Sequence, residues 1–479
     1  MNPHERHQRA LTRRALFSRA SVGVGAAALA ALLGEEAGSA EQPQLLPHHP
    51  PRAKRIIYLL QNGAPSHVDL FDEKPRLRAL HGTQLPDSIG AGRRFSTMVS
   101  GQSARPLLAA IAPFERHGEA GISVSSLMPE TARIADRLCF VRSMHTTQVN
   151  HAPAITFLLT GSERPGRPSI GAWLSYGLGR ATEELPTFVV MTSRDKEASC
   201  GQIFYDTYWS SGFLPSVHQG VKLRGSGDPV LYLQDPQGID AALRRGLLED
   251  LEALNRRTYA EVGDPETLTR IEQYELAHRM QTSVPELTDL SQEPAHVLEM
   301  YGPDVRRKGS FAYNCLMARR LVERGTRFVQ LMHAGWDQHK NLDTQLAVQC
   351  RDTDAPSAAL VKDLAQRGLL EDTLVVWGGE FGRTPFVQGA LDARDRGRDH
   401  HPYAFTLWLA GGGVRAGHVH GESDELGFEV ASDPVHVHDF QATLLHLLGI
   451  DHERLTYRYQ GRRFRLTDVH GSVVRPILA

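Results

Sequence analysis

Six short apolar runs without a helical period constrain the fold of this chain most strongly. They are RIIYLL (55–60), LCFV (138–141), TFVVM (187–191), RFVQLM (327–332), TLVVWG (373–378) and AFTLWLAG (404–411). Amphipathic stretches of helical length lie between several of them, including 311–325 and 357–370. Continuous apolar strands that alternate with helices are typical of a mostly parallel sheet with helices on both faces, so we expect a three-layer α/β fold.

Other segments complete the predicted organisation. Residues 240–299 are highly charged and helical in pattern, which predicts a helical insertion on the surface of the same domain. The sequence YRYQGRRFRL places Gly461 between two alternating runs and predicts a C-terminal hairpin. Residues 41–53 are rich in proline and form a predicted linker, so the α/β domain is expected over residues 54–479.

Residues 1–40 have the features of a twin-arginine export signal. Arg13 and Arg14 precede a weakly apolar stretch rich in alanine and glycine, and small residues near position 40 offer a cleavage site. The apolar segment 22–33 is shorter than the roughly 20 residues that a spanning helix needs. We therefore expect a cleaved signal, no stable membrane span afterwards, and a periplasmic or extracellular location; an uncleaved anchor is the alternative.

Charge and cysteine spacing argue against two classes of function. The formal net charge is -2 over 479 residues and no long run of one sign occurs, so nucleic acid is not an expected partner. The four cysteines, Cys139, Cys200, Cys315 and Cys350, form no CxxC pair that would bind zinc or carry redox chemistry. We expect buried thiols at Cys139 and Cys315, while a disulfide and the oligomeric state stay open.

Side chains of metal-ligand types gather next to three of the predicted strands. They are His333, Asp337, His339, Glu380, Arg383, Asp399, His400 and His401. Because ligands of an open α/β sheet bind beyond the carboxyl ends of its strands, we expect these loops to converge. A mixed set of imidazoles and carboxylates suits zinc, with manganese or iron as alternatives, better than magnesium or calcium.

The segment NHAPAITFLLTG (150–161) has the start and stop signals of a helix. Pro153 has its backbone preset for a first helical turn, and Gly161 can adopt the left-handed conformation that ends one. Asn150 and His151 therefore lie at a predicted helix N-terminus, where backbone N–H groups favour a bound anion. Both are candidate catalytic residues.

Two of these segments resemble motifs of the alkaline phosphatase and sulfatase superfamily. The sequence LLEDTLVVWGGEFGRTP resembles the strand and turn that bind metal there, and NHAPAITFLLTG resembles the arylsulfatase signature. From about Arg52 onward the chain is similar to the exported, sulfatase-like family called domain of unknown function 1501. The shared motifs are GAPSHVDLFDEKP, NHAPAITFLLTG, GWDQH, GGEFGRTP and GRDHHP. This resemblance implies an alkaline phosphatase/sulfatase-like fold.

The same resemblance implies a set of metal ligands. Glu380 matches the metal-binding Asp of the superfamily. Asp337 and His339 resemble its Asp and His pair, although one residue separates them here and three are usual. His400, or its neighbour His401, resembles the histidine that precedes the next strand. Asp337, His339, Glu380 and His400 would make a single-metal centre.

Several positions depart from the superfamily pattern. Gln61 and Asn62 stand at the end of the first strand where an Asp is usual, and Phe381 follows Glu380 where a His or Asn would bind. His151 holds the place of the cysteine that sulfatases convert to formylglycine. A formylglycine mechanism is therefore excluded for this chain.

We therefore expect a secreted, metal-dependent hydrolase of phosphate or sulfate esters, with a small-molecule or glycan ester as substrate. In this interpretation Arg383 clamps the anion, since its planar fork matches a tetrahedral oxyanion. His151 would be the nucleophile, the base on a metal-bound water, or a metal ligand. The alternative is a non-catalytic sulfatase-like protein that binds sulfated or phosphorylated glycans.

Overall fold

The computed structural model describes residues 46–479 apart from 91, 195–203 and 231–237. The predicted signal, residues 41–45 of the predicted linker and Cys200 lie outside the described residues. The chain divides into a short N-terminal unit, Met1–Leu46, and a second compact unit, Pro47–Ala479, which holds every described helix and strand.

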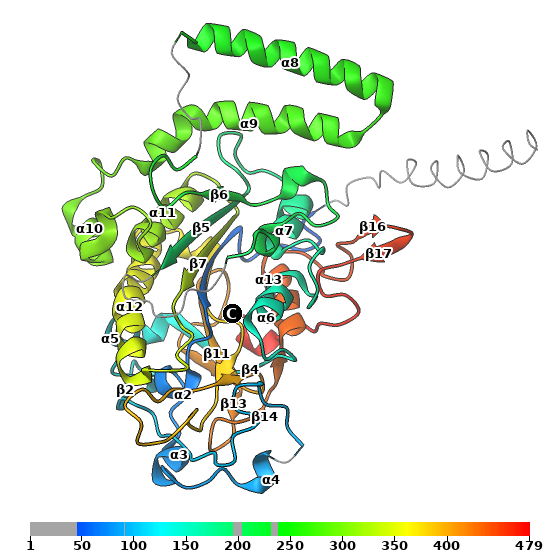
Figure 1. The fold of residues 1–479 in the computed structure, drawn as a ribbon. Coiled ribbons are helices and arrows are strands. Elements are labelled where there is room, and N and C mark those ends of the chain that lie inside the picture. Colours follow the sequence, from blue (N-terminus) through cyan, green and yellow to red (C-terminus); the bar gives the residue numbers. More distant parts are fainter. Residues whose placement is uncertain (1–45, 91, 195–203, 231–237) are drawn as a thin grey trace, which may run out of the picture. The chain divides into compact units, whose positions relative to one another are not determined.

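A nine-stranded sheet forms the centre of the second unit (Figure 1). Its strands are β1 (Arg55–Asn62), β4 (Leu138–His145), β5 (Phe188–Arg194), β6 (Val221–Leu223), β7 (Phe328–Ala334), β8 (Thr373–Gly378), β11 (Phe405–Ala410), β12 (His418–His420) and β15 (Val435–His436). Their order is β12-β4-β11-β8-β1-β7-β5-β6, and β15 pairs with β4. Each of the six predicted runs forms a strand of this sheet. Strand β11 is antiparallel to its neighbours β4 and β8, and the other pairs are parallel.

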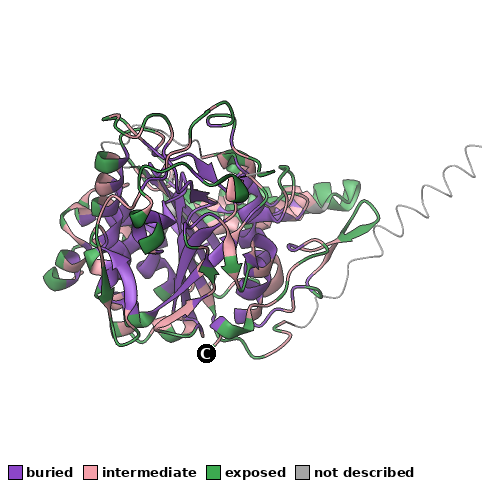
Figure 2. Ribbon diagram, turned by 90° about the horizontal axis from the view of Figure 1, so that it is seen from below, coloured by how far each residue is buried: buried purple, intermediate pink, exposed green. Residues whose placement is uncertain are grey.

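Helices cover both faces of the sheet (Figure 1). One layer holds α5 (Pro129–Ala132), α10 (Ala295–Tyr301), α11 (Phe311–Glu323) and α12 (Leu342–Gln366); the other holds α6 (His151–Thr160), α7 (Ile170–Leu178) and α13 (Val437–Leu447). The strands are buried between the layers (Figure 2). The predicted mixed α/β architecture is therefore confirmed.

Smaller elements surround this core. They are α2 (His67–Leu70), α3 (Pro75–Ala79), α4 (Asp87–Gly90), β2 (Phe114–His117), β3 (Ile122–Ser125), β9 (Gly382–Arg383), β10 (His400–His401), β13 (Glu422–Ser423), β14 (Val430–Ser432), β16 (Tyr457–Tyr459) and β17 (Arg462–Phe464). Strands β16 and β17 form the predicted C-terminal hairpin, with Gly461 at φ 77° in its turn. No described helix has both the length and the apolar character that a membrane crossing requires.

Helix α12 starts earlier than the sequence pattern predicts. The amphipathic stretch in the sequence begins at residue 357, directly after Pro356, and a proline inside a helix usually kinks or breaks it. In the structure Pro356 lies inside α12, which begins at Leu342. The added turns bury Leu346 and Cys350 completely or nearly so, and this apolar burial offsets the hydrogen bond that proline cannot make.

Cys139, Cys315 and Cys350 are free thiols in the core.

The charged segment 240–299 forms two long helices, α8 (Ala241–Val262) and α9 (Pro265–Thr288), before α10. Asp240 and Asp264 cap them, since each carboxylate accepts a backbone N–H of the first turn at 2.8 and 3.0 Å. Gly263, at φ 72°, ends α8. In Figure 1, α9 lies between α8 and the rest of the unit.

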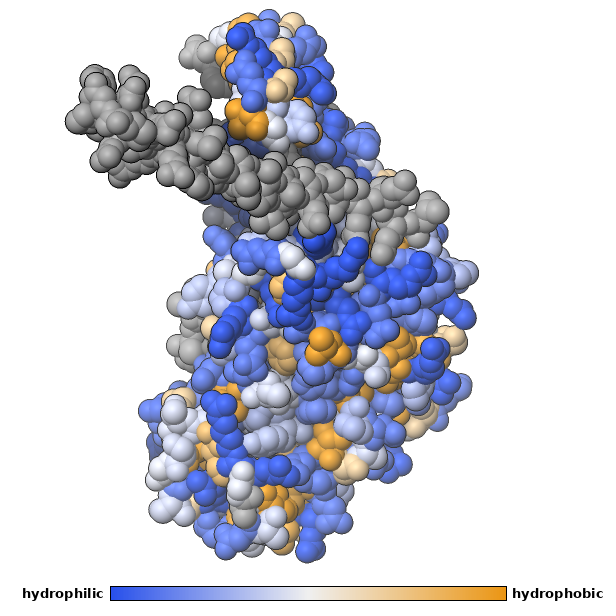
Figure 3. All heavy atoms as spheres, turned by 90° about the vertical axis from the view of Figure 1, so that its right-hand side faces the viewer, coloured by the Kyte–Doolittle hydropathy of each residue, from blue (hydrophilic) through white to orange (hydrophobic). Residues whose placement is uncertain are grey.

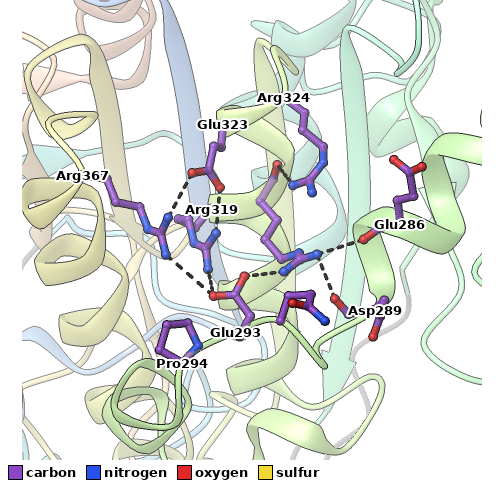
Figure 4. Close-up of a pocket in the computed structure, with 10 residues that line it drawn as sticks. Glu286, Asp289, Glu293, Pro294, Arg319, Glu323, Arg324 and Arg367 are labelled. Carbon is purple, nitrogen blue, oxygen red and sulfur yellow. Dashed lines mark hydrogen bonds and ion pairs between the residues drawn. The ribbon is translucent and has the colours of Figure 1, made fainter.

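A pocket of about 460 Å³ lies where the end of α9 meets α10, α11 and α12 (Figure 4). Arg319 contacts Glu293, Glu323 and Asp363 at 2.7, 2.7 and 2.9 Å, and Arg367 contacts Asp363 at 2.7 Å. Because these arginines already face carboxylates, the pocket is part of an ion-pair network that ties the helices together.

Two glycines that end helices provide a test of how tightly the chain packs around a helix end. Gly161 (φ 67°) and Gly263 (φ 72°) both adopt the left-handed conformation, which costs an alanine about 1–2 kcal/mol. A Cβ on Gly161 would overlap the Leu466 carbonyl oxygen, whereas one on Gly263 meets nothing within 4 Å. We expect Gly161→Ala to lower the free energy of unfolding by about 2–5 kcal/mol, since overpacking adds about 1–3 kcal/mol, and Gly263→Ala to cost about 1–2 kcal/mol. Urea unfolding measures both; equal losses would contradict the proposed clash.

Candidate metal centre

The predicted site residues come from one helix start and three loops at a single edge of the sheet. His151 is the first residue of α6, Asp337 and His339 follow β7, and Glu380 follows β8. His400 lies in β10, just before β11. Because β11 runs opposite to β8, its beginning lies at the same edge as the ends of β7 and β8. The sheet topology therefore brings distant parts of the sequence together.

Four of these side chains converge. The nearest ligand atoms of His151, Asp337, His339 and His400 all lie within 4.8 Å of one another. Oδ1 of Asp337 is 3.1 Å from Nε2 of His151, 2.9 Å from Nε2 of His339 and 3.3 Å from Nε2 of His400. The four side chains are between 8 and 15% exposed, so the cluster is largely buried but not sealed from solvent.

Two of the imidazoles are held in one orientation by oxygens behind them. Nδ1 of His339 is 2.6 Å from Oε1 of Gln388, and Nδ1 of His400 is 2.7 Å from the carbonyl oxygen of Val149. Each oxygen accepts, so the hydrogen-bond network assigns the proton to Nδ1. The lone pair of Nε2 then faces the cluster in both rings. Histidine ligands of metals are oriented in this way.

His151 is oriented in the same way, but the acceptor next to its Nδ1 is a carboxylate. Its Nδ1 lies 2.5 Å from Oε1 of Glu380, which also accepts the backbone N–H of Gly63 at 3.1 Å. Oε2 of Glu380 is buried and has no hydrogen-bond partner within the described part of the chain. Glu380 thus lies on the far side of His151 from Asp337, with one oxygen left for a further ligand.

Arg383 is buried behind Asp337. Its guanidinium is 1% exposed, and Nη2 donates to Oδ1 of Asp337 at 2.7 Å. Nε donates to the carbonyl of Ala64 at 3.0 Å, Nη1 to that of Arg398 at 3.2 Å, and Nη2 also to that of Gly63. Since every nitrogen of this side chain has a protein acceptor, Arg383 positions Asp337 and the turn after β1 in this arrangement.

The turn after β1 tolerates no larger residue at Gly63. Gly63 has φ 109°, and a Cβ there would lie 2.6 Å from the backbone nitrogen of Asp337. Ala64 is also left-handed, at φ 67°, which an L-residue adopts at a cost. Both carbonyls accept from Arg383, and this pairing holds the strained turn in place.

Charge around the cluster favours a cation. Burial favours the neutral form of the Asp337 carboxyl, yet the Arg383 guanidinium and the adjoining imidazoles hold its pKa far below the usual range. Burial lowers the pKa of His400 to about 3, so this imidazole is neutral at physiological pH. Burial also acts to lower the pKa of His151, but hydrogen bonds with Asp337 and Glu380 outweigh it and raise that pKa. Positive charge is therefore attracted to this point.

Three of the other predicted positions lie outside the cluster as follows. His333 is buried beside Ser193 and Gln349, at 3.0 and 3.1 Å from its two ring nitrogens. Nε2 of His401 contacts the carbonyl of Phe428, which leaves His400 as the member of the pair in the cluster. Asn150 is the exposed N-cap of α6 and makes no side-chain cap hydrogen bond.

Phe381, Gln388 and Val149 shape the cluster from outside it. The Phe381 ring packs against His151 and His400, with centroids 4.9 and 4.8 Å apart. Gln388 and Val149 supply the acceptors described above, and no motif in the sequence marks them. The acceptor of Val149 is a backbone carbonyl, which every residue has, so the sequence cannot mark it. Gln388 is held near His339 by an isolated β-bridge to Gly397, which forms only in the folded chain.

The model of the family described as "Protein of unknown function (DUF1501)" matches residues 53–478. The chain belongs to the DUF1501 family. This confirms the predicted family. A comparison with curated proteins found no match for this DUF1501 chain.

Solved structures similar to this DUF1501 protein are distant in sequence. The PsFucS1 sulfatase from Pseudoalteromonas sp. is 14% identical with a TM-score of 0.32, over 84% of this chain and 68% of that chain. A protein in the alkaline phosphatase superfamily from Vibrio parahaemolyticus is 11% identical with a TM-score of 0.34, over 86% and 71%. Alkaline phosphatase from the Antarctic bacterium TAB5 is 9% identical with a TM-score of 0.31, over 83% and 98%.

Adjacent histidines provide a matched test of the centre. We expect His400→Gln to lose bound metal, because Nε2 of His400 belongs to the cluster, and His401→Gln to retain it. Gln388→Ala removes the acceptor behind His339 and should weaken metal affinity by about 10- to 100-fold. Elemental analysis after dialysis against zinc measures the metal content of each variant, and circular dichroism confirms that each is folded. Metal retained by His400→Gln would contradict this assignment.

Proposed function

We propose that this protein is an exported, metal-dependent hydrolase of phosphate or sulfate esters that works without formylglycine. The observation that carries the proposal is the convergence of three imidazole Nε2 atoms on Oδ1 of Asp337. In the described residues this is the one group of side chains suited to hold a metal ion. Imidazole and carboxylate donors in this number suit zinc, with manganese or iron as alternatives.

In this proposal Asp337, His339 and His400 hold the ion. Their donor atoms are oriented before binding, since Arg383, Gln388 and the Val149 carbonyl fix the three groups from behind. A divalent metal at this point would polarise an ester oxygen and lower the pKa of a bound water. Glu380, assigned to the metal by resemblance, keeps Oε2 available for that role.

His151 is the proposed general base. Glu380 holds the proton on Nδ1, so Nε2 can accept a proton from an attacking water. A carboxylate hydrogen-bonded to an imidazole also stabilises the imidazolium that forms. Asn150 lies next to His151 at the start of α6, where backbone N–H groups and the helix dipole favour an anionic ester.

A second candidate is a non-catalytic, sulfatase-like protein that binds sulfated or phosphorylated glycans. Asn62 and Phe381 favour it, because they replace two residues that the superfamily uses at its metals. Asn62 is fully buried at the end of β1, and neither of its amide atoms has a partner among the described residues. An uncharged amide is a weaker ligand than a carboxylate, so the end of β1 offers a weaker position for a second cation.

Turnover separates the two candidates. We expect the zinc-loaded protein to hydrolyse members of a panel of aryl phosphates, phosphodiesters and aryl sulfates. His151→Ala should lower kcat by about 10²- to 10⁴-fold while metal content is kept, the range for loss of a general base. His333→Gln, outside the cluster, serves as the control. Bound metal without turnover on any ester, followed by binding of a sulfated glycan, would favour the second candidate.

Export is tested at the arginine pair. In a bacterium with a twin-arginine translocase we expect the wild-type chain in the periplasm or medium, shortened near residue 40. The double substitution Arg13→Lys, Arg14→Lys should keep the full-length chain in the cytoplasm, while Arg9→Lys, in the same segment, should export normally. Cell fractionation gives the location of each chain, and intact-mass measurement gives its length. Export of the double variant would contradict the predicted signal.

A further inference from the structure

Helix α8 exposes an apolar stripe. Large apolar side chains that are exposed cluster on the α8–α9 hairpin, which carries seven of the eleven in the described residues: Leu243, Leu247, Leu251, Leu254, Tyr259, Val262 and Tyr274. The four leucines are 41–59% exposed. Scattered exposed leucines are ordinary, whereas a run of them on one helix face marks an interaction surface.

The spacing of the leucines places them on one side of the helix. Leu243, Leu247, Leu251 and Leu254 follow one another at intervals of four, four and three residues, which line one face of an α-helix. Apart from Gly246, the partly buried positions of α8 are Arg244, Leu248, Glu252 and Asn255, a more polar set shifted around the helix. Helix α9 thus covers one edge of α8 and leaves the leucines open.

The stripe lies on the outermost element of the unit. Figure 1 shows α8 farther from the sheet than α9, and Figure 3 shows apolar side chains among charged ones on the hairpin at the upper end of the molecule. No described element of the chain covers the four leucines, which remain exposed. Among the described residues the stripe has no partner, so it is open to a second molecule.

The charges beside the stripe argue against a lipid surface. Helix α8 carries four arginines and four acidic residues: Arg244, Arg245, Arg256, Arg257, Glu249, Asp250, Glu252 and Glu261. Several pair within the helix, including Arg245 with Glu249 and Arg257 with Glu261, each at 3.1 Å. Helices that lie on membranes carry an excess of Lys and Arg on the polar face. A helix with equal numbers of positive and negative side chains is better matched to a protein surface that also carries both charges.

We propose that a second copy of this chain covers the stripe, with the two α8 helices antiparallel about a two-fold axis. When Leu251 is set opposite Leu254 of the second copy, the symmetry sets Leu254 opposite Leu251 and Asp250 beside Arg257 of the second copy. Asp250 is exposed and has no ion-pair partner within the described part of the chain. In this arrangement Arg257 of the second copy, which also pairs with Glu261 of its own helix, faces Asp250.

The parallel arrangement is disfavoured by charge. In a parallel, in-register pair Arg244 would face Arg244 and Glu261 would face Glu261. The antiparallel register sets Arg244 opposite Glu261 at both ends.

The leucines span about 17 Å at 1.5 Å per residue, so the contact is at the small end of protein interfaces and the dimer is concentration-dependent.

Sedimentation velocity of the exported protein over a wide concentration range tests the dimer. We expect reversible dimerisation of the wild type and its loss in Leu251→Glu, while Val469→Glu, at a more exposed apolar residue elsewhere, dimerises normally. Metal content and turnover should be unchanged in all three, so the result is independent of the hydrolase proposal. A wild type that stays monomeric, or a Leu251→Glu dimer, overturns the proposal.

A charge reversal tests the register. Asp250→Arg places two arginines together in the antiparallel pair and should abolish the dimer; adding Arg257→Asp to the same chain reverses the pair and should restore it. Failure of the double variant to dimerise overturns the proposed arrangement. A monomeric wild type that binds vesicles of phosphatidylglycerol, with binding lost in Leu251→Glu, would assign the stripe to a lipid surface instead.

Discussion

The buried guanidinium of Arg383 is the interaction on which the site depends. A charge that is 1% exposed must be paired, and Arg383 meets Asp337 on one side and backbone carbonyls on the others. Those carbonyls belong to the loops after β1 and β7 and before β10, so one side chain joins three segments far apart in the sequence. The planar fork of arginine allows this, and a lysine could not replace it.

The position of Asp337 determines what the cluster can do. Its carboxylate stays ionised against the effect of burial, and it sits where the Nε2 atoms of three histidines meet. Each imidazole has an oxygen behind Nδ1, so each presents a lone pair to the same point. One carboxylate surrounded by three imidazole Nε2 atoms is a group that could hold a metal ion, which is why metal binding comes before any proposed chemistry.

Part of this arrangement is predictable from sequence. The α6 helix begins at His151 and ends at Gly161 as its proline and glycine indicate, and Asp337, His339 and His400 meet as the strand-end pattern suggests. The start of α12 was not predictable from local pattern, because buried contacts keep the helix intact through Pro356. The anion-clamp role predicted for Arg383 rests on residue type alone, and the geometry gives this side chain internal acceptors instead.

The sequence by itself determines the α/β class, the family and the loops that meet at the site, because strand periodicity, helix caps and motifs are local properties of a chain. Tertiary structure alone decides the rest. Only folding could select His400 over its neighbour, since the two side chains point to opposite faces of a strand. Folding also placed Glu380 behind His151 and turned the leucines of α8 outward. These outcomes depend on which surfaces meet in space, and no local pattern records that.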